Sequence, residues 1–291
     1  MRDRIRPRRS VLYVPGSNAR ALEKAKGVPA DGLILDLEDA VAPDAKDAAR
    51  QRVGAAVKAG GYGRREVVIR VNGFATPWGH ADLEMAASAG ADAVLIPKVE
   101  SADAVRQALA VLDGAGAPAD LPLWCMMETP RGMLHAEEVA AASARVACLV
   151  MGTSDLAKEL HAAHTPMRLP MITALGLCLL AARAYRLAIL DGVCLDLQDE
   201  DGFAAACRQG AELGFDGKTL IHPGQIEAAN RAFAPDEAEI TRARRIIEAH
   251  EAAAREGKGV AVVDGRLIES LHVAEAKRQV ELAEVIAAMA S

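Results

Sequence analysis

The sequence predicts an α/β protein, a (β/α)8 TIM barrel that is followed by a C-terminal helical extension. Eight short runs of aliphatic and β-branched residues alternate with stretches of helical pattern, which is typical of parallel α/β folds. These runs are apolar almost throughout, as expected for parallel strands that are covered on both faces. The length of 291 residues also suits one barrel with an addition at one end.

The expected elements follow in order along the chain. The strands are expected at residues 11–14, 33–37, 67–71, 93–97, 123–127, 147–151, 192–195 and 217–221. The helices are expected at residues 18–26, 44–59, 77–89, 102–112, 132–142, 154–162, 171–189 and 200–213. Several helices begin at a capping residue, such as Asp44 or Ser101, and several end at a glycine, such as Gly214. An open doubly wound sheet is the alternative, but no G-x-G-x-x-G motif follows the first strand.

The last part of the chain exceeds what a barrel needs. We expect a helix at residues 236–256, a hairpin at 260–268 with its turn at Asp264 and Gly265, and a final helix at 271–289. The chain is therefore divided into a catalytic barrel domain, residues 1–233, and an extension, residues 234–291. This extension is either a packing appendage or a lid, over its own barrel or that of a neighbouring subunit.

The composition limits the partners and the compartment. The 34 Lys and Arg residues and 40 Asp and Glu residues give a net charge of −6, which argues against nucleic acid as the main partner but permits an anionic ligand. No apolar run reaches the roughly 18 residues that a membrane span needs, and the start of the chain lacks the apolar stretch of a signal peptide. The five cysteines form no C-x-x-C pair and are expected to be reduced and buried. We therefore expect a cytoplasmic protein without a membrane partner.

Polar side chains follow six of the expected strands, at the ends where parallel barrels carry their active sites. They are Asp36, Glu38, Asp39, Arg70, Asn72, Lys98, Glu100, Glu128, Thr129, Thr153, Ser154, Asp155 and His222. Any one of them alone fits a surface charge or a helix cap. Together they predict an acid-rich pocket with two cations, Arg70 and Lys98, at its edge.

Two of these carboxylates are candidates for a metal site. Glu128 and Asp155 end neighbouring expected strands, which lie ~4.8 Å apart in a sheet. Mg²⁺ prefers a few carboxylates together with water and substrate oxygens. The alternatives are an ion pair between Glu128 and Arg131, and a place for Asp155 in the first turn of a helix, where the dipole favours it. No cluster of His and Cys points to zinc.

The two cations at the edge each have two interpretations. Arg70 follows a strongly apolar strand, so it either clamps a carboxylate or oxyanion in the pocket or forms a structural ion pair with Glu38 or Asp39. Lys98 is either a Schiff-base lysine or the partner of Glu100.

The motifs that carry these residues resemble a known family. The segments are R-S-V-L-Y-V-P-G at 9–16, L-D-L-E-D-A-V-A-P at 35–43, R-V-N-G at 70–73, I-P-K-V-E at 96–100, E-T-P-R-G at 128–132 and G-K-T-L-I-H-P at 217–223. In this order they resemble the citrate lyase β-subunit-like branch of the HpcH/HpaI aldolase superfamily, which includes malyl-CoA and citramalyl-CoA lyases.

The resemblance implies a TIM barrel, Mg²⁺ dependence, a CoA-thioester substrate and a homotrimer or hexamer. It implies that Glu128 and Asp155 hold the metal and that Arg70 contacts the substrate and stabilises an enolate. It also implies an acid/base residue near the C-terminus that a neighbouring subunit delivers. That residue is Glu269 here, in D-G-R-L-I-E where the family has D-G-x-x-I-D. A second departure is G-T-S-D at 152–155, where the family often has G-A-E-D.

We therefore expect a Mg²⁺-dependent carbon–carbon lyase that cleaves a β-hydroxyacyl-CoA of the malyl-CoA or citramalyl-CoA type into acetyl-CoA and a 2-oxoacid. Glu38 is a further candidate catalytic residue, and Thr153 borders the substrate pocket. Arg9, Arg20 and Lys26 are candidates for the CoA phosphates, with ordinary surface charge as the alternative. Three other functions remain open: a malyl-CoA thioesterase on the same scaffold, a CoA-independent metal aldolase, and a non-catalytic subunit of a larger lyase complex.

Overall fold

The computed structural model describes residues 6–255, 257 and 259–290. By their contacts, these residues divide into two compact units, residues 8–233 and residues 6–7 together with 234–290. The outermost residues of the two expected domains, 1–5 and 291, lie outside the described residues, as does Glu256 at the end of an expected helix.

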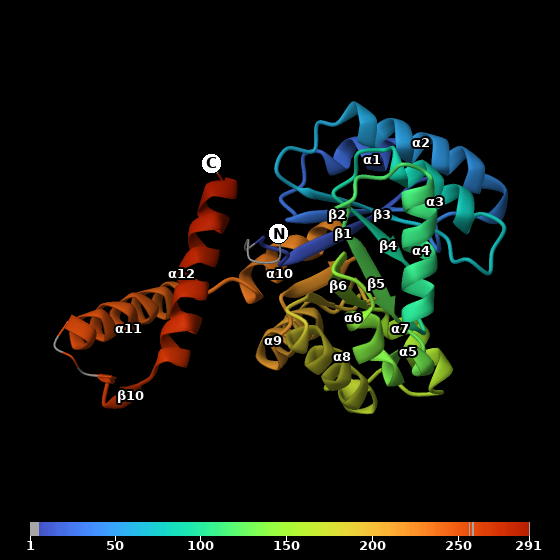
Figure 1. Ribbon diagram of the computed structural model, residues 1–291. Helices are drawn as coiled ribbons and strands as arrows, with labels where there is room; N and C mark the ends of the chain where they lie inside the picture. Colours follow the sequence, from blue (N-terminus) through green and yellow to red (C-terminus); the bar gives the residue numbers. More distant parts are fainter. Residues whose placement is uncertain (1–5, 256, 258, 291) are drawn as a thin grey trace. The chain divides into compact units, whose positions relative to one another are not determined.

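The unit of residues 8–233 is a closed barrel of eight parallel strands that pair in sequence order (Figure 1). The strands are β1 (Ser10–Pro15), β2 (Gly32–Asp36), β3 (Glu66–Arg70), β4 (Ala93–Ile96), β5 (Leu123–Met127), β6 (Val146–Met151), β7 (Ala188–Asp191) and β8 (Gly217–Leu220). The last strand pairs with the first, with Val11 opposite Thr219. The expected (β/α)8 barrel is therefore confirmed.

Helices surround the strands in Figure 1. They are α1 (Ala19–Ala25), α2 (Lys46–Ala59), α3 (Gly79–Ala87), α4 (Ala102–Gly114), α5 (Pro130–Leu134), α6 (Ala136–Ala141), α7 (Thr153–Glu159), α8 (Ile172–Ala184), α9 (Glu200–Leu213) and α10 (Ile226–Ala232), with short 3-10 turns at Pro43–Ala45, Leu169–Met171 and Pro223–Gln225. The side chains of Asn18, Ser101, Thr129 and Asp199 cap four of these helices by accepting backbone N–H groups.

The barrel unit has two apolar layers, one inside the barrel and one between the strands and the helices. Alternate strand residues such as Ile34, Val68 and Trp124 fill the inside of the barrel, while their neighbours along each strand pack against the helices. Two residues beyond Ile34 and Val68, on the same inner face, come Asp36 and Arg70. The inside of the barrel is therefore apolar through its middle and becomes charged at the carboxyl ends of the strands.

One strand lies elsewhere than the sequence predicts. The expected strand at 192–195 is wrong, because β7 is Ala188–Asp191, and the preceding helix α8 ends at Ala184 instead of residue 189. Arg186 has a left-handed φ of 55°, which ends the helical path before the strand begins. The apolar run from 171 to 190 fits a buried helix and a buried strand equally well by periodicity, so the sequence could not mark the boundary.

The second unit is built from two helices and a hairpin. Its elements are α11 (Glu237–Arg255), β9 (Ala261–Val263), β10 (Arg266–Ile268) and α12 (Ser270–Ala290). Asp264 and Gly265 have positive φ values of 52° and 73°, as the expected two-residue hairpin turn requires. Ile246, Val263 and Ile268 belong to the unit's own apolar cluster.

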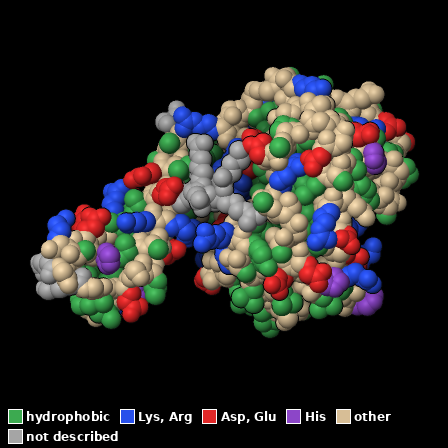
Figure 2. Space-filling view, viewed as in Figure 1, with side chains coloured by type: hydrophobic (Ala, Val, Ile, Leu, Met, Phe, Trp, Pro, Cys, Tyr) green, Lys and Arg blue, Asp and Glu red, His purple; other side chains and the backbone are tan. Residues whose placement is uncertain are grey.

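The structure also describes the surface and the cysteines. None of the helices in the described part of the chain is long and apolar enough to cross a membrane. On the face of the barrel unit seen in Figure 2, acidic and basic side chains are interspersed. All five cysteines are free thiols, and four of them are buried while Cys194 is partly exposed.

Candidate active site

A buried ion pair fixes Arg70 at the mouth of the barrel. Strand register places Asp36 of β2 beside Arg70 of β3. Arg70 Nε and Nη2 each donate to one oxygen of Asp36 at 2.6 Å, and its guanidinium carbon lies 4.7 Å from the centroid of the Tyr13 ring. Burial works against the charge, but the carboxylate of Asp36 keeps the pKa of Arg70 well above its ordinary value. The guanidinium is therefore charged, buried and fixed in orientation.

The sequence did not identify Asp36 as the partner of Arg70. It offered Glu38 and Asp39, and both do contact Arg70 Nη1, at 3.0 Å and 3.2 Å. Their contacts are single, whereas that of Asp36 is bidentate, a geometry that fixes a guanidinium in orientation. The signal that could have found Asp36 was its inward register on β2, next to Arg70 on β3.

Glu38 lies between the two cations of the rim. Its Oε2 is 3.0 Å from Arg70 Nη1, and its Oε1 is 3.7 Å from Lys98 Nζ. The side chain is mostly buried, and burial raises its pKa to about 7, with Asp39 and Glu128 adding to the rise and Arg70 opposing it. Glu38 can therefore take up or release a proton near neutral pH.

A buried lysine binds the connection between β2 and α2, which contains Glu38. Lys46 Nζ donates to the carbonyl oxygens of Leu37 and Glu38, at 2.9 Å and 2.7 Å, and to Asn72 Oδ1 at 2.7 Å. The side chain of Asn72 in turn donates to Asp82 at 2.7 Å. This network fixes the position of the Glu38 backbone at the carboxyl end of the barrel.

Glu128, directly after β5, presents one free oxygen. Its Oε1 accepts the backbone N–H of Lys98 at 2.8 Å, while its Oε2 is buried with no hydrogen-bond partner. Burial raises the pKa of Glu128 to about 7, with Asp155 adding to the rise. Gly152 makes room for it, because a Cβ at Gly152 would lie 2.4 Å from Glu128 Cβ and 2.6 Å from Oε2.

The donor set around Glu128 fits a magnesium ion. Glu128 has a buried carboxylate oxygen without a partner. The partly buried Asp155, in the first turn of α7, is near enough for its charge to raise the pKa of Glu128. The alternative ion pair of Glu128 is not formed, because Arg131 lies 3.9 Å from Glu100 instead. Among the described residues no group of three or more His, Cys, Asp and Glu side chains could enclose a metal. Two carboxylates and an open remainder are what Mg²⁺ accepts, with water and substrate supplying the other oxygens.

Lys98 lies near the carboxylates of Glu38, Glu128 and Asp155. The side chain is half exposed, at 49%, and pairs with Glu38 and not with Glu100. Although burial lowers its pKa, the carboxylates of Glu38, Glu128 and Asp155 raise it above the ordinary value. A lysine that is held protonated in this way is a poor nucleophile.

The other expected binding residues are spread over the molecule. Thr153 is buried at the start of α7, on the same rim as Asp155. Arg20 is exposed in the first turn of α1, near the carboxyl end of β1. Lys26 lies after the end of α1, paired with Glu23 at 2.8 Å, so it lies toward the opposite end of the barrel from Arg20.

Arg9 is not at the mouth. It immediately precedes β1 and donates two hydrogen bonds, of 2.8 Å and 2.7 Å, to Asp31, which immediately precedes β2. Both residues therefore lie at the amino ends of the strands. This placement removes Arg9 and, with it, Lys26 from the group of residues available to a ligand at the carboxyl ends.

Glu269 belongs to the second unit, where it is exposed and directly precedes α12. Its backbone N–H donates to His272 Nδ1 at 3.0 Å.

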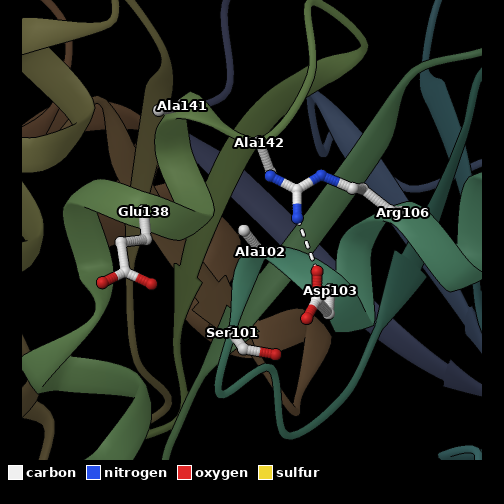
Figure 3. A pocket seen from close by; sticks show the side chains of 7 residues that line it. All are labelled: Ser101, Ala102, Asp103, Arg106, Glu138, Ala141 and Ala142. Carbon is white, nitrogen blue, oxygen red and sulfur yellow. Dashed lines mark hydrogen bonds and ion pairs between the residues drawn. The ribbon is translucent and has the colours of Figure 1, made fainter.

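Two hollows on the barrel unit are separate from the charged side chains described above. One of about 430 Å³ lies between α4 and α6, where Arg106 pairs with Asp103 across from Glu138 (Figure 3). Another of about 350 Å³ is lined by residues of α5, α6 and α8, including Leu134, Leu177 and Leu180. Neither contains Arg70, Glu128 or Asp155.

Fold and rim together define a TIM barrel with a fixed arginine and a pair of carboxylates at its mouth. A family model described as HpcH/HpaI aldolase/citrate lyase matches residues 9–223. Over 288 residues, 99% of each chain, the protein is 53% identical to a (3S)-malyl-CoA thioesterase of Cereibacter sphaeroides strain KD131. It is 36% identical to citrate lyase subunit beta of Escherichia coli strain K12, over 97% of this chain and 95% of that one. The chain therefore belongs to the HpcH/HpaI aldolase/citrate lyase family, as its motifs indicated.

A solved structure agrees with this assignment. Protein CitE from Mycobacterium tuberculosis in complex with magnesium, acetoacetate and coenzyme A has a TM-score of 0.77 to this protein at 29% identity. The similarity covers 98% of this chain and 100% of that chain. A relative of this fold has thus been crystallised with both magnesium and coenzyme A.

Proposed function

We propose that this protein hydrolyses a malyl-CoA-type thioester to the free hydroxydicarboxylic acid and coenzyme A, and that it uses Mg²⁺. The observation that carries this proposal is the 53% identity, over 99% of both chains, to a malyl-CoA thioesterase. The sequence alone placed a carbon–carbon lyase first and the thioesterase second. The identity reverses that order while keeping the same substrate class.

Glu128 and Asp155 would hold the metal, because Glu128 has a buried oxygen free and Asp155 lies close to it. When bound there, Mg²⁺ supplies Lewis-acid polarisation of substrate oxygens. Thr153 and Arg20 remain the binding residues that we propose for the substrate and for CoA, since both lie toward the carboxyl ends of the strands.

Arg70 would stabilise the negative charge that develops on the thioester oxygen. Its two bonds to Asp36 hold the guanidinium in place before the substrate arrives, so little reorganisation is needed as the charge develops. The same placement serves the oxyanion of hydrolysis and the enolate of carbon–carbon cleavage. Arg70 therefore fits either reaction.

Glu38 would act as the base in hydrolysis. With a pKa of about 7 it can accept a proton from a water molecule whose oxygen attacks the thioester carbonyl carbon. The carbon–sulfur bond then breaks, and the sulfur leaves as a thiolate that takes up a proton. We propose that Glu269 of a neighbouring subunit in a homotrimer or hexamer donates that proton.

The second candidate is the lyase reaction, favoured by the 36% identity to citrate lyase subunit beta. Here a base takes the proton of the β-hydroxyl group, and the carbon–carbon bond of the β-hydroxyacyl-CoA breaks to give a 2-oxoacid and the enolate of acetyl-CoA. Arg70 would stabilise that enolate, and Glu269 would protonate its carbon.

A single assay separates these reactions. Purified protein is incubated with malyl-CoA and Mg²⁺, and free thiol, malate and 2-oxoacid are measured in parallel. Thiol and malate in equal amounts without 2-oxoacid support the thioesterase. Formation of 2-oxoacid and acetyl-CoA without free thiol establishes the lyase instead. The assay is repeated with citramalyl-CoA, and no turnover of either thioester contradicts both reactions and favours a non-catalytic subunit or a CoA-independent aldolase.

A further inference from the structure

Lys98 has an unusual backbone conformation at the centre of the rim. Its φ is 51°, in the left-handed region that side chains other than glycine, asparagine and aspartate seldom adopt. It follows β4 by two residues and belongs to the connection between β4 and α4. Such a conformation persists only where the surrounding structure determines it, and it is concentrated at functional sites.

The surrounding contacts show how the connection is held. The next residue, Val99, donates its N–H to the carbonyl of Met126 in β5 at 3.2 Å. The carbonyl oxygen of Val99 is 2.4 Å from where a Cβ at Gly132 would lie, so only glycine permits this approach of α5. With its successor fixed in this way, Lys98 completes the turn in the left-handed conformation.

The main chain of Lys98 occupies one of the two oxygens of Glu128. The N–H of Lys98 points at Glu128 Oε1 and donates to it at 2.8 Å. The other oxygen, Oε2, is buried and has no partner. One oxygen is thus held by the main chain, and the other is left for a ligand.

We propose that Lys98 is a positioning residue for the metal site: its left-handed main chain orients the Glu128 carboxylate so that Oε2 faces the bound cation. The proposal rests on the proposed function, in which Glu128 is a ligand of Mg²⁺. The ammonium group is not needed for this role. Because that positive charge lies beside the site, its removal leaves cation binding unchanged or tighter.

A matched pair of variants separates the main chain from the charge. Lys98→Asn and Lys98→Val both remove the ammonium group and have side chains of similar size. Asparagine tolerates a left-handed φ, whereas a β-branched valine does not. The measured quantity is the dissociation constant of Mn²⁺, which shares the oxygen ligands of Mg²⁺, from the electron paramagnetic resonance of free Mn²⁺ in substrate-free protein.

We expect Lys98→Asn to bind Mn²⁺ at least as tightly as the wild type and Lys98→Val to bind it about tenfold or more weakly, the usual cost of losing a group that orients a ligand. A milder pair, Lys98→Gly and Lys98→Ala, applies the same comparison with less strain and serves if the valine variant does not fold. The alanine variant is expected to bind more weakly than the glycine variant. Equal constants within the folded pairs overturn the proposal and leave the proposed function standing. Absence of Mn²⁺ binding by the wild type, or unchanged binding by Glu128→Gln, overturns both.

Discussion

At the scale of single residues, space matters as much as charge. The carboxylate of Glu128 fits its place only because Gly152 has no side chain. The charge of Arg70 is useful only because Asp36 holds it in one orientation. Residues with no reacting group of their own therefore set the geometry of the proposed site.

Gly152→Ala tests this dependence on space. The added methyl group would collide with Glu128 Cβ and Oε2, so we expect kcat/KM to fall about 100-fold, as for reacting groups displaced by an ångström. Mn²⁺ binding should weaken in parallel. Gly176→Ala, in helix α8, is the matched control, because a Cβ there meets nothing within 4 Å, and it should keep full activity. Full activity in Gly152→Ala would contradict the placement of Glu128.

Glu38 predicts a pH dependence of turnover. A base must be deprotonated to work, and burial raises the pKa of Glu38 to about 7, so kcat at saturating Mg²⁺ should rise with pH up to about 7 and then level off. The charged groups that face Glu38 are Asp39, Lys46, Arg70, Lys98 and Glu128. Glu38→Gln should lose most of the turnover together with this acid limb.

The control for Glu38 is another carboxylate of the same rim. Glu100→Gln replaces a half-exposed side chain near Arg131 and should keep the pH profile of the wild type. If Glu38→Gln retains the acid limb of the profile, a different group is the base.

At the scale of elements, buried polar networks fix the connections between strands and helices. Lys46 of α2 fixes the connection after β2 by donating hydrogen bonds to three acceptors. A second network ties β7 to β8, where Lys218 donates to Asp191 at 2.8 Å and Arg168 donates to both oxygens of Asp191. Lys218 belongs to the G-K-T-L-I-H-P motif, and its side chain is almost fully buried.

Lys46→Met should loosen the connection that carries Glu38. Three acceptors would lose their buried donor, at a cost of about 1–3 kcal/mol in the free energy of unfolding. We also expect kcat to fall, because the position of Glu38 is no longer fixed. Urea denaturation measures the first effect and steady-state kinetics the second. Lys58→Met, on the exposed face of the same helix, should change neither, and a stable, fully active Lys46→Met would contradict this role.

At the scale of the whole molecule, the two compact units carry different parts of the proposed machinery. The barrel unit holds Arg70, Glu38 and the carboxylate pair, whereas Glu269 lies in the unit of residues 234–290. If a neighbouring subunit delivers Glu269, two different inactive variants should complement each other in mixed oligomers.

This expectation can be tested by co-expression of Glu128→Gln with Glu269→Gln. Each variant alone should be nearly inactive. In randomly mixed oligomers about a quarter of the sites would combine an intact barrel with an intact Glu269, so up to about a quarter of the wild-type activity should return. No recovery in proven mixed oligomers would show that Glu269 serves its own barrel, and full activity of Glu269→Gln would show that it has no catalytic role.

The sequence by itself determined the architecture and the end of the barrel at which the proposed site lies. Seven of the eight strands overlap their expected positions. Buried parallel strands need near-continuous apolar runs, and such runs can be recognised in the sequence. The polar residues that directly follow those runs predicted the rim, because they lie next to the strand ends in the sequence.

Only the tertiary structure decided how the rim residues meet. The pairing of Arg70 with Asp36 depends on the register between two strands. The free oxygen of Glu128 depends on the backbone dihedral of Lys98 and on the space beside Gly152. The start of β7 depends on where Arg186 turns the chain out of its helix. Register and close approach are relations between segments far apart in the chain, and the order of side chains along it encodes neither them nor these backbone angles directly.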